Sequence, residues 1–267
     1  MTQKIPFKNS EIRFADEGKG EVVVLLHGYL ETLEIWDDFC RFFMPRYRII
    51  RMDIPGHGQS GTVAEIHSME LMAEAVDTVL QYLDIRSCVM GGHSMGGYVA
   101  LAYLENHPER LKGVCLFHSS PLADSEEKKA SRSKEIRLMN EGKLSLICQF
   151  SIPNGFAADN LEKFADKVNR AIFLARLSSS EGIIALLKGI RERPDRRKLL
   201  ENNRLPLLFL LGKKDFHINF DQLSPLAASF PHSDVVALEN AGHSGYFEEP
   251  EASAKALLTF LEKCFVR

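Results

Sequence analysis

Short apolar runs rich in β-branched residues alternate with helical patterns along most of this 267-residue chain. Alternation of this kind favours βα units and a mostly parallel sheet with helices on both faces. The runs are apolar almost throughout, as strands covered on both faces require. We expect strands at residues 22–26, 47–52, 87–90, 113–117, 207–211 and 235–238, and an edge strand at residues 8–15.

One long block interrupts the alternation. Apolar residues at helical spacing predict helices at residues 68–83, 98–106 and 251–265, each close to a predicted strand. Between residues 121 and about 204 no strand pattern occurs, and helices are predicted at residues 126–141, 157–175 and 180–192. This indicates an inserted unit. We therefore expect a core of residues 1–120 and 201–267 carrying an all-helical cap of residues 121–200.

Composition and charge exclude several classes of protein. The chain is 45% hydrophobic and 26% charged with a net charge of −3, so we expect neither nucleic acid nor an anionic membrane surface as a partner. Its five cysteines are scattered without a CxxC pair, which indicates reduced thiols and not a disulfide framework or metal site. No signal-like or membrane-spanning apolar segment occurs near the N-terminus. We expect a cytoplasmic monomer or homodimer without membrane insertion.

The strongest local motif is Gly92-His93-Ser94-Met95-Gly96, which follows a predicted strand and precedes a predicted helix. A serine on such a strand-to-helix turn is exposed at the edge of the sheet in a strained conformation, and the flanking glycines allow the close approach that the turn needs. The helix that follows directs its N-terminal N–H groups and dipole at the same point. The motif predicts that Ser94 is a nucleophile.

A serine hydroxyl needs a base, and the base needs an acidic partner that fixes its tautomer. His243 follows the last predicted strand and Asp215 follows the strand before it, at the same edge of the sheet as Ser94. Asp221 is an alternative acid, although it lies six residues further on and within a predicted helix. The chain order Ser94, Asp215, His243 predicts a catalytic triad.

A tetrahedral intermediate requires two donors for its oxyanion. The backbone N–H of Met95 is one candidate because it follows the nucleophile. The second donor is expected from the loop after the first long strand, where the backbone N–H of Tyr29 is the candidate and Gly28 lets the loop come close.

Five segments together resemble the α/β-hydrolase superfamily, above all its small, lidded serine esterases. They are HG at 27–28, DIPGHGQS at 53–60, GHSMGG at 92–97, GKKD at 212–215 and NAGH at 240–243. The resemblance covers roughly residues 20–120 and 200–267. It implies the α/β-hydrolase fold with a sheet of about eight strands, a helical cap and no cofactor. Relatives that cleave epoxides or carbon–halogen bonds carry Asp where this chain has Ser94.

Other residues suit structural positions first. His27, His57 and His93 flank glycines in tight loops and are expected to pack or tether those loops, and Asp53 is expected to anchor its loop. The candidate pocket residues are Leu30, His118, Phe150 and Ile152, although His118 suits a buried place in or beside the core first and the two cap residues suit the core of the cap first.

These features predict hydrolysis of a carboxylic ester or thioester of a small to medium acyl group, through an acyl-enzyme on Ser94. Two alternatives remain open. An enzyme of this fold could act on a carbon–carbon bond or as a lyase, which an arginine-lined pocket for a carboxylate would favour. The cap offers four arginines for this: Arg132, Arg137, Arg170 and Arg176. A non-catalytic ligand-binding receptor would keep the fold without the reaction, although all three triad residues are present.

Overall fold

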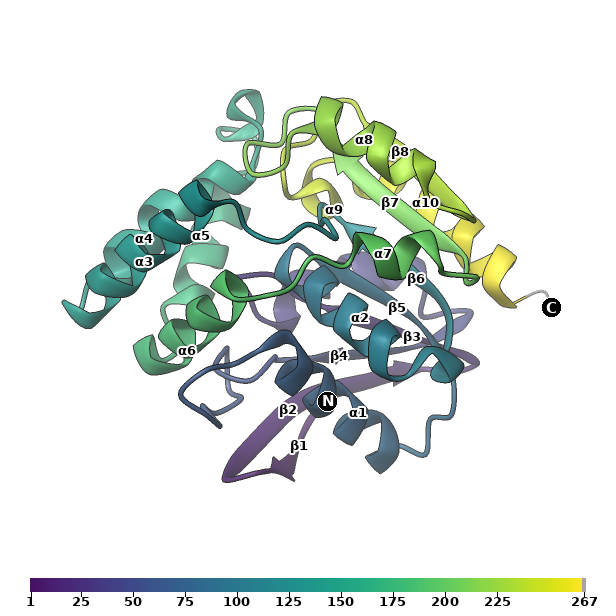
Figure 1. Ribbon diagram of the computed structural model, residues 1–267, viewed down its shortest axis with the longest axis horizontal. Helices are drawn as coiled ribbons and strands as arrows, with labels where there is room; N and C mark the ends of the chain where they lie inside the picture. The colour runs from purple at the N-terminus through teal and green to yellow at the C-terminus, as the bar shows by residue number, and fades with distance from the viewer. Residues whose placement is uncertain (266–267) are drawn as a thin grey trace.

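The computed structural model describes residues 1–265, in which eight strands form one sheet (Figure 1). The strands are β1 (Thr2–Phe7), β2 (Ser10–Gly18), β3 (Glu21–Leu26), β4 (Tyr47–Met52), β5 (Cys88–His93), β6 (Leu111–Phe117), β7 (Leu207–Gly212) and β8 (Ser233–Leu238). Their order across the sheet is β1-β2-β4-β3-β5-β6-β7-β8. Only the β1–β2 and β2–β4 pairs are antiparallel, and the remaining neighbours are parallel. The expected mostly parallel sheet of about eight strands is confirmed.

The six strand predictions from residue 22 onward are confirmed within a few residues, but the first strand differs. Residues 8–15 were expected to form one edge strand, whereas the chain forms a hairpin of β1 and β2 that turns at Lys8 and Asn9. Lys8 adopts a positive φ of 51° there. A lysine is an uncommon residue in that conformation, and so the turn has no recognisable sequence pattern.

Helices cover both faces of the sheet. The α-helices of the core are α1 (Met69–Tyr82), α2 (Met95–Asn106), α7 (Arg197–Glu201), α8 (Phe220–Ser229), α9 (Gly245–Glu248) and α10 (Pro250–Phe265). The 3₁₀ helices are η1 (Leu33–Trp36), η2 (Phe39–Phe42), η3 (Pro108–Arg110), η4 (Pro153–Gly155) and η5 (Ala158–Asn160). In Figure 1, α1 and α2 lie in front of the sheet and α10 lies behind it.

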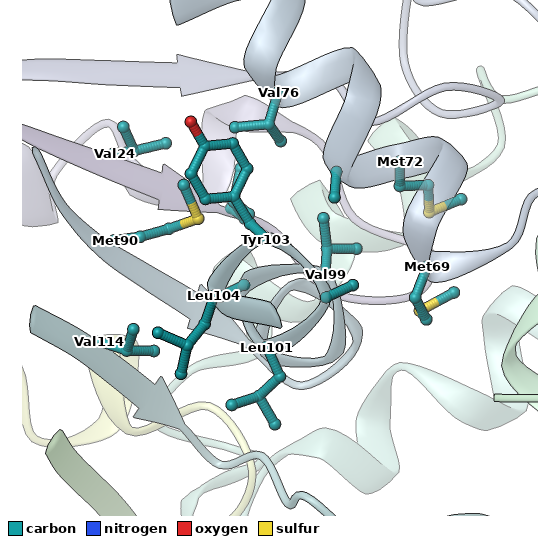
Figure 2. Packing of buried hydrophobic residues seen from close by; sticks show 14 of the residues in the cluster. Val24, Met69, Met72, Val76, Met90, Val99, Leu101, Tyr103, Leu104 and Val114 are labelled. Atoms are coloured by element: carbon teal, nitrogen blue, oxygen red, sulfur yellow. The ribbon is translucent and has the colours of Figure 1, made fainter. Parts of the chain in front are cut away.

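Two separate apolar clusters hold these layers together. The larger one joins α1, α2 and α8 to one face of the sheet, and Figure 2 shows Val76, Val99 and Tyr103 packed toward Val24 and Met90 of the strands. The second joins η1, η2 and α10 to the opposite face around the buried Trp36. With both faces covered, the inner parallel strands such as β3, β5 and β7 bury their side chains on each side, which explains why their sequences are continuously apolar.

The chain between β6 and β7 contains helices and no strand within the described residues. Its α-helices are α3 (Glu126–Asn140), α4 (Leu144–Ser151), α5 (Ala165–Ala175) and α6 (Ser180–Arg191), which lie together at one end of the molecule (Figure 1). The long helix expected at residues 157–175 is wrong: η5 and a turn precede α5. The domain boundary expected at residue 200 falls inside α7, whose Leu200 packs in the larger core cluster.

Buried thiols are distributed through these layers. All five cysteines are buried, and burial raises the pKa of Cys40 and of Cys88 to about 12, which keeps both thiols protonated. In the part of the chain that the structure describes, no helix combines the length and the apolar character needed to cross a membrane.

Candidate active site

Ser94 occupies the turn between β5 and α2 with φ 49° and ψ −112°, a conformation that a non-glycine residue adopts only under strain. The glycines beside it are required by close contacts. A Cβ on Gly92 would lie 2.2 Å from the backbone of Gly96, and a Cβ on Gly96 would lie 2.5 Å from the carbonyl oxygen of Leu26. The turn is tied down because the N–H of Ser94 donates to Phe117 over 2.9 Å. This sharp turn places Ser94 at the N-terminus of α2.

Asp215 lies just after β7, and each of its carboxylate oxygens is held by donors. Oδ1 accepts the backbone N–H groups of His217 (2.8 Å) and Ile218 (3.0 Å), and Oδ2 lies 2.7 Å from Nδ1 of His243. Burial raises the pKa of this carboxyl, but the neighbouring His243 and His118 rings outweigh burial and hold it well below its ordinary value. Asp215 is therefore an anion. The alternative acid, Asp221, is exposed in α8.

His243 follows β8 and is buried against the rings of His93 and His118. An ionised carboxylate only accepts hydrogen bonds, so Nδ1 of His243 carries the proton that faces Asp215. In neutral His243 this leaves Nε2 with a lone pair. Among residues 1–265 no hydrogen bond joins the Ser94 hydroxyl to His243, but both side chains line the same cavity. In substrate-free enzymes such bonds are often long and shorten when substrate binds.

His118, a pocket candidate that suited a buried place beside the site first, does not line the cavity. It is completely buried behind Asp215, with Nδ1 3.3 Å from Oδ2 of that carboxylate. The backbone N–H groups of Gly245 and Gly212 point at its Nε2 (3.2 Å) and Nδ1 (3.3 Å), so the ring is held by the backbone on both sides. Burial lowers the pKa of His118 to about 4, which keeps the ring neutral. His118 thus packs directly behind Asp215, where it helps to lower the pKa of that carboxyl, and it does not line the cavity.

A buried ion pair that the sequence did not predict lies on the other side of Ser94. His93 Nδ1 lies 2.8 Å from the carboxylate of Glu31, and its Nε2 lies 2.8 Å from the carbonyl oxygen of His243. Both partners are acceptors, so both ring nitrogens must carry protons and His93 is a cation. Burial opposes both charges. Their mutual attraction nevertheless raises the pKa of His93 and lowers that of Glu31 to about 2.

Glu31 connects three parts of the site through this pair. Its Oε2 also accepts the N–H of Gly28, and its Oε1 accepts the hydroxyl of Tyr246 over 2.7 Å. The pair therefore joins the loop that carries Tyr29 to the turn of Ser94 and to the backbone of His243. The one signal in the sequence is the place of Glu31, five residues after the predicted strand at residues 22–26 and so at the reactive edge of the sheet.

Replacing Glu31 by glutamine is expected to lower the free energy of unfolding by roughly 1.5–3 kcal/mol, because a charge-assisted network loses its anion. The stability that ionised Glu31 contributes is complete above the ordinary carboxyl pKa of about 4.3. It is lost as pH falls through the pKa of Glu31 in the folded protein, which is about 2. The His93 contribution is complete below about pH 6.5 and is lost as pH rises through its raised pKa. The loss of stability in Glu31→Gln, measured by urea unfolding, should therefore be largest near pH 5–6 and smaller near pH 9–10.

Glu248→Gln is the matched control for this experiment. Glu248 is also buried and accepts the N–H groups of Ala157 and Gly242, but no histidine pairs with it. Glu248→Gln should lower the free energy of unfolding, and this loss should not become smaller at alkaline pH. If the loss of stability in Glu31→Gln stays constant from about pH 5 to 10, that result would contradict a charged His93.

The two candidate oxyanion donors line the same cavity as Ser94. Met95 is the first residue of α2, so its N–H belongs to the helix N-terminus, where such groups have no partner within the helix. Tyr29 lies in the loop that Glu31 holds through Gly28. Leu30 next to it has a positive φ of 57°, which marks a sharp change of chain direction. That these two N–H groups bind the oxyanion stays a prediction.

The cavity has a volume of about 400 Å³ and lies between the carboxyl edge of the sheet and the inserted helices. Two of the four pocket candidates, Leu30 and Ile152, line it. Phe150 does not: it is 69% exposed on α4, and the prediction for it is wrong because one helical position decides between cavity and solvent. Phe156 of the helical insertion also lines the cavity.

Of the four cap arginines, only Arg132 lines the cavity, and Arg137, Arg170 and Arg176 are exposed. The guanidinium of Arg132 is paired with the buried carboxylate of Asp124. It is therefore not a free anchor for a substrate carboxylate.

The remaining sequence expectations concern structural residues. His27 accepts the N–H of Ile54 and so tethers its loop, and His57 packs against the ring of His27. Asp53 is fully buried. It accepts the N–H of Leu33 and forms an ion pair with Arg13. The expected packing and anchoring roles of these residues are confirmed.

His118, Asp215 and His243 are close enough for one ligand atom of each to surround a metal ion. Hydrogen bonds already account for this grouping, because Oδ2 of Asp215 accepts from His243 and lies 3.3 Å from Nδ1 of His118. A metal would have to displace the proton on Nδ1 of His243 and the N–H of Gly212 from Nδ1 of His118. The cluster fits a hydrogen-bonded relay better than a metal centre.

Comparison with known proteins gives consistent results. A family model described as alpha/beta hydrolase fold matches residues 21–140. The chain is 28% identical to a thermophilic esterase from Thermogutta terrifontis, whose structure superposes with a TM-score of 0.93 and covers 99% of each chain. It is 27% identical to a pimeloyl-[acyl-carrier protein] methyl ester esterase of Yersinia enterocolitica, over 92% of this chain and 95% of that protein.

A third relative has a different reaction in its name. The chain is 26% identical to a 2-hydroxy-6-oxononadienedioate/2-hydroxy-6-oxononatrienedioate hydrolase of Comamonas testosteroni, over 95% of this chain and 92% of that protein. By contrast, it spans only 64% of the length of a dihydrolipoyllysine-residue acetyltransferase component of an acetoin cleaving system from Pseudomonas putida, with 27% identity.

Proposed function

Because the chain belongs to the α/β-hydrolase superfamily, we propose that it is a serine hydrolase that cleaves a carboxylic ester or thioester of a small to medium acyl group. The observation that carries the proposal is the 2.7 Å contact between Nδ1 of His243 and the anionic Asp215, with Ser94 facing the same cavity. The resemblance to two esterases supports the same reaction class. No cofactor is needed for it.

In the proposed reaction the Ser94 hydroxyl attacks the acyl carbon while Nε2 of His243 takes its proton. Asp215 keeps the other ring nitrogen protonated and offsets the charge of the imidazolium. The backbone N–H groups of Tyr29 and Met95 receive the oxyanion. His243 then returns the proton to the leaving alcohol or thiol, which gives the acyl-enzyme. A water molecule repeats the cycle and releases the acid and free Ser94.

The proposal assigns the helical insertion, residues 121–200, as a cap over the core formed by residues 1–120 and 201–267. The cap contributes Ile152 and Phe156 to the cavity wall, and Leu30 of the core packs in its apolar cluster. The cap therefore selects the substrate, and the core carries out the chemistry.

A carbon–carbon bond hydrolase is the second candidate, favoured by the likeness to the Comamonas testosteroni enzyme. Its substrate, as named, is a dicarboxylate, and the cavity has one arginine that could bind a carboxylate. Because Asp124 already pairs with Arg132, the cavity supports ester hydrolysis better.

The test is a panel of p-nitrophenyl esters of graded chain length, combined with a fluorophosphonate label mapped by mass spectrometry. We expect label on Ser94 and ester turnover that declines once the acyl group exceeds the cavity of about 400 Å³. Labelled Ser94 with negligible ester turnover would favour carbon–carbon cleavage. An unlabelled Ser94 would exclude the serine mechanism and favour a ligand-binding receptor.

A further inference from the structure

The part of the cavity wall that α3 forms is polar. Four residues of α3 line it, and their spacing places them on one face of the helix. All four carry polar side chains: Lys128, Ser131, Arg132 and Glu135. A cavity built only for a hydrocarbon acyl chain would present apolar residues at these positions, because unpaired polar groups are costly to bury.

Two groups in this wall have unused hydrogen-bonding capacity. The hydroxyl of Tyr29 is buried and has no hydrogen-bond partner. The carboxylate of Glu135 forms neither a hydrogen bond nor an ion pair within the described residues. The two groups are close enough to interact, since the charge of Glu135 adds to the effect of burial in raising the pKa of Tyr29. Burial also raises the pKa of Glu135, and Arg132 opposes that shift.

We propose that Tyr29 and Glu135 form a subsite for a hydroxyl group of the substrate, remote from the bond that is cleaved. A hydroxyl can donate to the Glu135 carboxylate and accept from the Tyr29 phenol, which satisfies both groups. A substrate carboxylate would be repelled by Glu135. A substrate ammonium would meet the positive side chains of Arg132 and Lys128 in the same wall. The preferred substrate is therefore a hydroxylated, uncharged ester.

This inference rests on the proposed ester hydrolysis. It is independent of the catalytic role of Tyr29, because the oxyanion donor is the backbone N–H and the subsite uses the phenol. Tyr29→Phe removes the phenol and retains the backbone N–H. The variant thus separates substrate recognition from catalysis.

The test compares pairs of esters of equal chain length that end in a hydroxyl or in a methyl group. The hydroxyl is placed on the acyl part in one series and on the alcohol part in the other. We expect the wild type to prefer the hydroxyl-terminated member by about tenfold or more in kcat/KM at the best length, since a site built to bind a hydroxyl discriminates against an analogue that lacks it. Tyr29→Phe and Glu135→Leu should each reduce the preference to about twofold or less, with turnover of the methyl-terminated esters retained.

Two control variants test whether the effect is specific to Tyr29 and Glu135. Tyr98→Phe removes another tyrosine hydroxyl from the cavity wall and should keep the preference. Lys134→Ala, on the exposed side of α3, should change neither preference nor activity. Equal use of both members of every pair by the wild type would overturn the subsite, as would equal loss on both members in Tyr29→Phe.

Binding distinguishes failure of the subsite from failure of the proposed function. If no ester is turned over, the thermal shift produced by hexane-1,6-diol is compared with that produced by hexan-1-ol in the wild type and in Tyr29→Phe. A larger shift with the diol that disappears in Tyr29→Phe supports the subsite without any reaction. Equal shifts with both alcohols would contradict it.

Discussion

Replacing Ser94 by alanine is expected to lower kcat on any accepted ester by on the order of 10⁴-fold or more, because the acyl-enzyme can no longer form. KM should change little, since the hydroxyl of Ser94 makes no hydrogen bond in the described structure and the cavity walls are unchanged. Circular dichroism and the melting temperature should match those of the wild type. The measurement is steady-state hydrolysis of the best p-nitrophenyl ester, with active enzyme counted by the fluorophosphonate label in the wild type.

Ser120→Ala provides the matched control. Ser120 also follows the carboxyl end of a strand, but its hydroxyl only accepts a backbone N–H from Leu122 over 3.2 Å. We expect less than about a threefold change in kcat for this variant. Retention of more than about a tenth of wild-type kcat by Ser94→Ala, free of contaminating enzyme, would refute the nucleophile assignment.

Asp215→Asn is expected to lower kcat by on the order of 10³–10⁴-fold with little change in KM. The backbone N–H groups of His217 and Ile218 both point at Oδ1, so the amide oxygen of asparagine should occupy that position. The amide NH₂ then faces Nδ1 of His243. A donor there requires Nδ1 to accept, which moves the ring proton to Nε2 and prevents that nitrogen from taking the proton of Ser94.

The alternative acid supplies the control for this substitution. Asp221 is exposed in α8, so Asp221→Asn should leave kcat within about twofold of wild type. Loss of activity in Asp221→Asn together with full activity in Asp215→Asn would reverse the assignment of the acid. Nuclear magnetic resonance of ¹⁵N-labelled histidine gives a direct check, because the tautomer of His243 should differ between wild type and Asp215→Asn.

The parts of the fold predicted best were those in which sequence neighbours determine the conformation. The internal strands were predicted because burial on both faces demands continuous apolar runs, as in β3 and β7. The turn at Ser94 was predicted because two glycines remove the Cβ atoms that would clash there. The hairpin turn at Lys8 was missed because no glycine, proline or asparagine stands at its positive-φ residue.

Side-chain contacts between distant segments could not be predicted in the same way. Glu31 and His93 are 62 residues apart, and nothing in either segment indicates that the two side chains meet. His118 and Phe150 were both considered for the pocket, yet one is buried behind Asp215 and the other faces solvent. The direction of a side chain at a strand end or on a short helix depends on the packing of the whole element.

The amino-acid sequence by itself determined the α/β class of this protein, the sharp turn at Ser94 and the order of the residues proposed as its triad, because each depends on periodicity or on a short motif. Only the tertiary structure decided which carboxylate meets His243, that His93 is a buried cation, and that Tyr29 and Glu135 line one cavity. These properties depend on distances between segments that are far apart along the chain, and such distances exist only once the sheet and the helical insertion have packed together.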